Sequence, residues 1–197
     1  MKKMIIGVAM LLFANVGFGQ VSDNAVIPVS VTLNSILRLT VESGGNIQFV
    51  VNTIEDYTTG IANSTRYITN FNVASSRNFN VLIYSESDKL YGMNYFDDGI
   101  NPVTPSRGMD LDNIGFSVTA GAAASVGTNN ASSVIALSTS TTPVLGTVSA
   151  GSSTANQFSI LWQLGTQAGG MKNASLLSQS ITADTYVTNV FINVVPL

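Results

Sequence analysis

The sequence has no cysteine and no histidine among its 197 residues. Without cysteine, there is no disulfide to hold the fold together and no thiol to serve as a nucleophile. Without histidine, both the commonest general base and the commonest metal ligand are missing. The familiar Cys–His and Ser–His nucleophilic pairs are therefore excluded, and we predict that the protein is not an enzyme.

Charge is also scarce. Only 10% of the residues are charged, and 8 basic residues against 11 acidic residues give a formal net charge of −3. A weakly acidic chain with scattered lysine and arginine argues against nucleic acid as a partner. A surface with so little mutual repulsion favours packing into assemblies, so we expect self-association into a polymer or a surface layer.

Long apolar runs are almost absent, and the one candidate lies near the amino terminus. Two lysines precede the apolar run 4–13, and small residues follow it ahead of Gln20. A positive start, a short apolar run and small residues before a cut are typical of a secretory signal peptide. We therefore expect residues 1–19 to be removed and the protein to be secreted, with no integral membrane span. The alternative is an uncleaved anchor.

Alternating apolar and polar residues dominate the remaining chain, as in "VIPVSVTL" (26–33), "ILRLTVE" (36–42) and "NFNVLIYS" (78–85). Turn signals separate these runs, whereas helix signals are weak, and "EDYTTG" (55–60) is predicted to be a turn. About ten short strands of this kind predict an all-β fold. We expect an antiparallel β-sandwich of the immunoglobulin-like or pilin-like, Greek-key type.

Alanine, glycine, serine and threonine dominate residues 119–156. One interpretation is a flexible linker between two small domains. Val144, Leu145 and Val148 are spaced like strand residues, however. We therefore favour long hairpin loops within one domain that covers residues 20–197.

One stretch rich in acidic residues, "FDDGINPVTPSRGMDLDN", offers a candidate metal site. Asp97, Asp98, Asp110 and Asp112 supply the hard oxygen ligands that Ca²⁺ takes in loops. The spacing does not match an EF-hand, and Asp-Gly and Asn-Pro also form ordinary turns. Calcium is thus one prediction for this stretch, and a plain loop is the other.

Aromatic residues cluster just before that stretch, at Tyr91, Tyr95 and Phe96. Exposed aromatic rings can stack on sugar rings, so these residues are the candidate glycan-binding site. Ordinary packing within the core and loops is the alternative.

The chain closes on "TYVTNVFINVVPL" (185–197), which alternates with period two and therefore requires neighbouring strands. The first and last strands can pair within one domain. Alternatively, the first strand can add to a neighbouring subunit, where main-chain hydrogen bonds supply affinity and alternate side chains fill pockets. Pro28 suits an edge position because it lacks an amide donor. The predicted assembly strands contain Val26, Ile27, Val29, Val31, Leu33, Val190, Ile192 and Val194.

The layout resembles exported bacterial β-sandwich subunits of the fimbrial and spore-coat type. The resemblance lies in the signal peptide, the opening "VSVTLNSILRLTVESGGNIQF", the hairpin "FNVASSRNFNVLIYS" and the closing "ITADTYVTNVFINVVPL". Fimbrial subunits commonly carry a cysteine pair, which this chain lacks. The resemblance implies a structural role outside the cell or at the surface of a bacterium, reached through the periplasm, with no catalytic residues.

Together these patterns predict a secreted filament subunit, pilus-like or fimbria-like, that assembles by donor-strand addition. The alternative is a cell-adhesion module that binds carbohydrate or Ca²⁺.

Overall fold

The computed structural model describes residues 27–62, 65–93, 108–179 and 181–197. The chain divides into two units, Met1–Leu33 and Asn34–Leu197. In the first unit, residues 27–33 are the described part; they are all exposed, and none of them lies in a helix or strand. The predicted signal peptide and Val26 lie outside the described residues.

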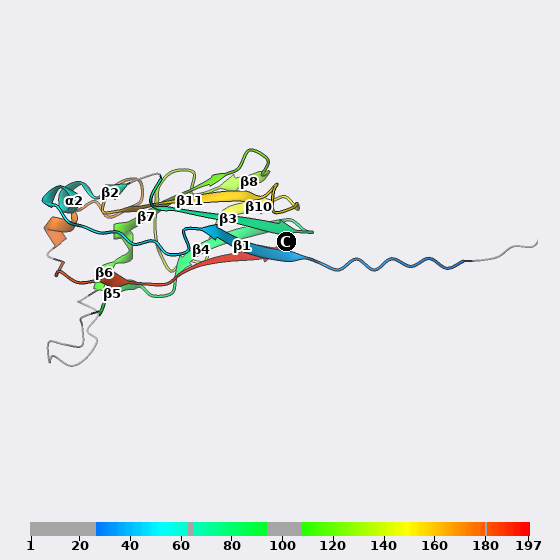
Figure 1. The fold of residues 1–197 in the computed structure, drawn as a ribbon, viewed down its shortest axis with the longest axis horizontal. Helices are drawn as coiled ribbons and strands as arrows, with labels where there is room; N and C mark the ends of the chain where they lie inside the picture. Colours follow the sequence, from blue (N-terminus) through cyan, green and yellow to red (C-terminus); the bar gives the residue numbers. More distant parts are fainter. Residues whose placement is uncertain (1–26, 63–64, 94–107, 180) are drawn as a thin grey trace, which may run out of the picture. The chain divides into compact units, whose positions relative to one another are not determined.

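The second unit is built almost entirely from β-strands, which confirms the all-β prediction (Figure 1). Its strands pair antiparallel throughout. The finer sandwich type, immunoglobulin-like or pilin-like, stays a prediction. The strands are β1 (Leu37–Ser43), β2 (Ile61–Ala62), β3 (Ile68–Ser75), β4 (Phe79–Ser85), β5 (Lys89–Gly92), β6 (Gly108–Asp110), β7 (Ile114–Ala120), β8 (Val126–Asn129), β9 (Ile135–Ala136), β10 (Pro143–Val148), β11 (Gln157–Leu164), β12 (Tyr186–Val187) and β13 (Val190–Pro196).

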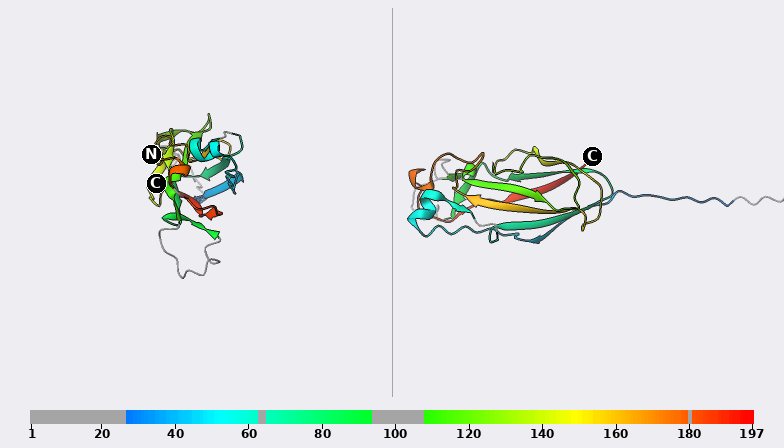
Figure 2. Two further views of the ribbon diagram at one scale, coloured as in Figure 1. Left: turned by 90° about the vertical axis from the view of Figure 1, so that its left-hand side faces the viewer. Right: turned by 90° about the horizontal axis from the view of Figure 1, so that it is seen from above.

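These strands form three sheets. The largest has the order β1-β3-β11-β7-β9, with β2 also paired to β11. The second has the order β13-β4-β10-β8, and a small third sheet has the order β12-β5-β6. Consecutive strands β3 and β4 belong to different sheets, so the short turn 76–78 carries the chain from the first sheet to the second. The hairpin predicted for "FNVASSRNFNVLIYS" is therefore wrong, because its two strands pair with other strands and not with each other. Figure 2 shows the strands of the two larger sheets from two further directions.

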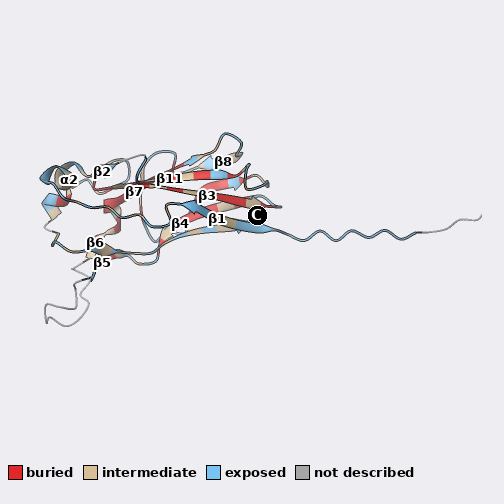
Figure 3. Cartoon of the chain, in the orientation of Figure 1, coloured by how far each residue is buried: buried red, intermediate tan, exposed pale blue. Residues whose placement is uncertain are grey.

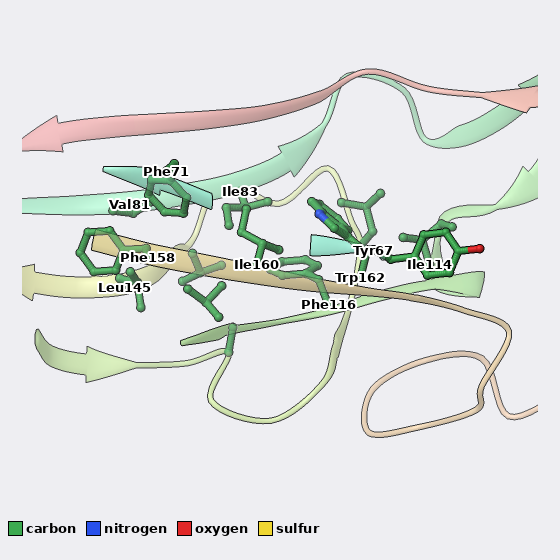
Figure 4. Close-up of a cluster of buried hydrophobic side chains, with 14 of the residues drawn as sticks. Tyr67, Phe71, Val81, Ile83, Ile114, Phe116, Leu145, Phe158, Ile160 and Trp162 are labelled. Atoms are coloured by element: carbon green, nitrogen blue, oxygen red, sulfur yellow. The ribbon is translucent and has the colours of Figure 1, made fainter. Parts of the chain in front are cut away.

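A single hydrophobic core contains side chains from both larger sheets (Figures 3 and 4). Alternation along β11 buries Phe158, Ile160 and Trp162, as expected for a strand with one covered face. The ring centroids of Phe71 and Phe158 are 5.1 Å apart, a distance typical of favourable aromatic pairs. The Trp162 indole N–H donates to the Thr69 hydroxyl at 2.9 Å, so its polar atom is satisfied in the core.

The stretch 119–156 contributes strands β8, β9 and β10 to the two larger sheets. Val144, Leu145 and Val148 on β10 are all buried in the core. Residues between these strands form the turns and loops that their serine, threonine and glycine content favours.

Short helical segments are α2 (Ile54–Thr59), η3 (Leu111–Asn113) and η4 (Leu176–Gln179). The turn predicted at 55–60 is therefore wrong, because most of this stretch lies in α2. The Thr53 hydroxyl accepts from the Asp56 amide and the Asp56 carboxylate accepts from the Thr53 amide, which forms a capping box. In the described part of the chain, no helix has the length and apolar character needed to cross a membrane.

Candidate functional site

Strand β13 ends the second sheet, with β4 as its one hydrogen-bonded neighbour in the described chain. The register runs from Val190 opposite Ser85 to Pro196 opposite Phe79 without a shift. A strand with one neighbour leaves half of its backbone groups without a sheet partner. The side of β13 that faces away from β4 is therefore a free edge.

The hydrogen bonds at the two ends of β13 show which backbone groups face that edge. Glu86 N–H donates to the Asn189 carbonyl, and Leu197 N–H donates to the Asn78 carbonyl. Because backbone direction alternates along a strand, the odd-numbered residues from 189 to 197 point their amide and carbonyl groups toward β4. The groups of Val190, Ile192 and Val194 therefore point to the free edge.

Strand β1 ends the first sheet in the same way, with β3 as its neighbour. Ser76 N–H donates to the Ile36 carbonyl at 2.9 Å, which directs the even-numbered residues of β1 toward β3. Leu37, Leu39 and Val41 consequently direct their backbone groups away from β3. The alternating sequence of β1 does not by itself show that this strand is a second edge.

Apolar side chains point inward from both edges but are only partly covered. Leu39 lies opposite the fully buried Val73, and residues directly opposite each other share one face of the sheet. Leu37 and Val41 share that face, yet they remain 38% and 44% exposed. On β13 the inward-facing, half-buried residues are Val190, Ile192 and Val194.

Both edges lie on one side of the second unit (Figure 1). The turn 76–78 holds the start of β1 through the bond between Ile36 and Ser76 and the end of β13 through the bond between Leu197 and Asn78. We call this the open side, defined by the free edges of β1 and β13. Among the hydrogen bonds of the described residues, none links β1 to β13 across it.

The opposite side, formed by β7 and the chain from β8 to β9, is closed. Val118 N–H donates to the Ala131 carbonyl at 2.7 Å, and the side-chain amide of Asn129 donates to the Val118 carbonyl at 2.8 Å. Leu137 N–H donates to the Ile114 carbonyl, and both Ala131 and Leu137 are buried. The chain thus covers its own core on this closed side.

The segment Ile27–Leu33 is described by itself as part of the first unit. It alternates apolar with small polar residues, and Ile27, Val29, Val31 and Leu33 are between 77% and 90% exposed. Four exposed apolar side chains in one uncharged segment form the kind of apolar surface that marks an interaction site. Strand addition requires alternate side chains that are free to enter pockets of another sheet, and these four side chains are exposed in that way.

The predicted calcium residues that the structure describes are Asp110 and Asp112, whereas Asp97 and Asp98 lie outside the described residues. The Asp110 carboxylate accepts from the ammonium groups of Lys89, at 3.0 Å, and Lys172. The pKa of Asp110 is lowered, first by the hydrogen bond from Lys172 and second by the hydrogen bond from Lys89. The hydrogen bond to Asp110 in turn raises the pKa of Lys172. The Asp110 side chain is thus neutralised by lysine in this structure.

Asp112 is a weaker partner in the same group, because its Oδ1 lies 3.9 Å from the Lys172 ammonium. This oxygen is buried and has no hydrogen bond, although the side chain as a whole is 43% exposed. Within the described ranges, no group of three or more acidic residues is placed to hold a metal ion. Calcium binding at the four predicted carboxylates stays a prediction.

Of the predicted glycan-binding residues, Tyr91 lies on β5 and is half-buried, and Tyr95 and Phe96 lie outside the described residues. The Tyr91 hydroxyl donates to the Asp88 carboxylate at 2.8 Å, which raises the pKa of Tyr91. Glycan binding at these three residues stays a prediction.

No protein-family model matches the chain, and no curated protein matches it. The features of this chain that bear on its function are thus the free edges of β1 and β13 and the exposed segment Ile27–Leu33.

Proposed function

We propose that this protein is an exported structural subunit that assembles by β-strand addition into a filament outside the cell or at its surface. One observation carries the proposal: a single chain combines an exposed, alternating apolar segment, Ile27–Leu33, with a β13 edge whose inward face is incompletely covered. The signal-peptide pattern at residues 1–19 supports export, and the low charge content supports close association.

The energetics favour such an association. Burying one valine, leucine or isoleucine side chain contributes about 1.5–3 kcal/mol. Strand addition would also give partners to the backbone groups of the free edge, each hydrogen bond contributing about 0.5–1.5 kcal/mol. Four apolar side chains and a run of main-chain bonds act against the cost of ordering a seven-residue segment, which is about 1–2 kcal/mol per residue, and against the freedom of motion that two copies lose when they associate.

The geometry of this contact yields a polymer. The segment and the edge are different surfaces of the same chain, so the contact between two copies is heterologous. Each added copy presents a fresh segment and a fresh edge, and the assembly continues head to tail unless a ring closes.

Electron microscopy of the chain from Gln20 onward tests the proposal. We expect filaments in negative stain at high protein concentration, and we expect their loss when residues 20–33 are deleted. A monodisperse monomer at all concentrations would contradict the proposal, as would filaments that persist after the deletion.

A matched pair of lysine substitutions separates loss of apolar burial from a change in charge. Val31→Lys places a charge on the apolar face of the segment, whereas Ser30→Lys places the same charge on the polar face. We expect Val31→Lys to raise the critical concentration for assembly at least about tenfold, because an unpaired lysine is costly to bury. Ser30→Lys is expected to change it less than about threefold. Equal effects of both changes would argue against insertion of one face.

A further inference from the structure

We propose that the free edge of β13, and not that of β1, accepts the segment Ile27–Leu33 of a second copy, and that the added strand runs antiparallel with Val31 opposite Ile192. This inference rests on the proposed function, because it specifies the acceptor, direction and register of the strand addition. The choice of edge, the direction and the register follow from three separate features of the chain.

The two edges of the open side differ in how well they resist pairing. Strand β1 carries Arg38 and Glu42 and has a register irregularity between Val41 and Ser43. Charged residues and bulges are the devices by which proteins prevent an edge strand from recruiting another chain. Strand β13 has no charged residue from Val190 to Pro196 and no shift in its register. It is therefore the edge that remains competent to accept a strand.

Pro28 determines the direction. In an antiparallel pair, residues directly opposite each other share a face, and in every second pair the two residues exchange both of their hydrogen bonds. The inward-facing residues of β13 direct their backbone groups to the edge, so their partners are the apolar residues of the segment. The backbone of Pro28 then points away from β13, so its lack of an N–H removes no hydrogen bond to that strand. In a parallel pair, the edge-facing residues of β13 would instead bond to the polar residues of the segment, which lie between its apolar residues. Pro28 would then be one of the bonding residues, and because it has no N–H, one hydrogen bond would be lost.

The register follows from matching two seven-residue strands over their full length. Antiparallel pairing then places Leu33 opposite Val190, Val31 opposite Ile192 and Val29 opposite Val194. Each of these three pairs can exchange two hydrogen bonds. Pro196 has no N–H, but its carbonyl is free to accept from Ile27 at the end of the pair. A shift by two residues in either direction would leave apolar side chains of the segment beyond the edge.

This register also places complementary faces together. The apolar side chains of the segment would lie beside the half-buried Val190, Ile192 and Val194 and would complete the cover of the core. The alternate residues, Ser30 and Thr32, would lie on the outer face. Their neighbours there would be Asn193 and Phe191, both of which are exposed.

Disulfide trapping tests the pairing, since the native chain has no cysteine to interfere. In the proposed register, Ser30 and Asn193 form a non-hydrogen-bonded pair, with Cα atoms about 4.5 Å apart, which is suitable for a disulfide. We expect the Ser30→Cys, Asn193→Cys double variant to form a ladder of covalent oligomers under mild oxidation of assembled protein. Thr32→Cys with Asn193→Cys, offset by two residues, is expected to give at least about tenfold less product.

A third double variant tests the alternative edge. Ser30→Cys with Thr40→Cys would trap a strand added to β1, and we expect little oligomer from it. A ladder from this variant, with filaments still visible by microscopy, would overturn the choice of β13 and leave the proposed function intact. A covalent monomer from the Ser30→Cys, Asn193→Cys variant would show that the segment pairs within its own chain, which would overturn the role of a second copy. Absence of filaments in the cysteine-free protein would instead count against the proposed function.

A proline pair tests the direction independently. In the antiparallel arrangement, Val31 N–H donates to β13 and Ser30 N–H points away. We expect Val31→Pro to abolish assembly and Ser30→Pro to leave filaments visible, with a critical concentration within about fivefold of the unmodified chain. The reverse pattern, in which Ser30→Pro is the damaging change, would establish parallel addition and overturn this part of the inference.

Discussion

The two sides of the strand unit differ in what covers the core. On the closed side, the chain from β8 to β9 gives hydrogen-bond partners to Ile114 and Val118 of β7 and buries Ala131 and Leu137. On the open side, β1 and β13 have no such cover in the described residues, and their inward-facing side chains stay half-exposed. One chain thus completes its core on one side and leaves it incomplete on the other.

The contrast shows that this fold can cover the edge of a sheet with its own chain, because it does so on the closed side. The closed side uses a short connection from β8 and the small strand β9, all within about twenty residues of β7, and loop closure over such a distance is inexpensive. The open side lies between the first and last strands of the unit, and neither strand has a second sheet neighbour among the described residues. The missing cover must come from elsewhere, and the proposed source is a second copy.

The largest expected effect compares two phenylalanines. Phe116 on β7 is 1% exposed, whereas Phe191 on β13 is 44% exposed and points outward beside Tyr84. We expect Phe116→Ala to lower the free energy of unfolding by about 3–5 kcal/mol because it leaves a cavity. Phe191→Ala is expected to cost less than about 1.5 kcal/mol, the scale of one exposed aromatic pair. Urea denaturation of non-assembling protein measures both, and equal losses would contradict the difference in cover.

A smaller effect concerns the side-chain bonds of the closed side. The side-chain nitrogen of Asn129 donates to the Val118 carbonyl, and the side-chain oxygen of Asn129 accepts from the Ala131 backbone N–H at 3.0 Å. Asn129→Ala leaves both backbone groups without these partners and should lower the free energy of unfolding by about 1–3 kcal/mol. The matched control, Asn193→Ala on the exposed face of β13, should change it by less than about 0.5 kcal/mol. A control that costs as much as Asn129→Ala would show that the open side is as tightly held.

The smallest effect concerns charge and lies away from both sides, at the ion pairs of Asp110. Lys172 and Lys89 lower the pKa of Asp110, so the carboxylate stabilises the fold above its unfolded pKa of about 3.9 and loses this contribution as pH falls through the lower folded value. The side chain is 42% exposed, so solvent screening limits the contribution to about 1 kcal/mol or less. Asp110→Asn should therefore be slightly destabilising at pH 6, and this loss should shrink as the pH falls below about 3.9. A larger loss at the lower pH would contradict this assignment.

The alternation of apolar and polar residues was sufficient to predict the β-class and the two strands β3 and β4, because period two fixes which side chains share a face. The alternation could not show which strands are neighbours in a sheet. The sequence "ILRLTVE" alternates equally well in the middle of a sheet and at its edge, and only the tertiary structure shows that β1 is an edge.

Two further features depended on contacts that local patterns do not encode. The pairing of Asp110 with Lys172 joins residues 62 positions apart, so a cluster of carboxylates was all that the sequence offered. The helix α2 has six residues and no buried side chain, so it lacks the apolar periodicity by which helices are recognised. Its capping box, Thr53 with Asp56, was the one signal available.

Amide hydrogen exchange of the monomer and of the assembled protein tests the central claim most directly. The free-edge amides of Val190, Ile192 and Val194 should exchange rapidly in the monomer, whereas the Val118 amide on the closed side should be protected. Upon assembly, the three β13 amides should become protected by at least about tenfold, and those of β1 should change little. Protection of the β13 amides already in the monomer, or no gain upon assembly, would contradict the account.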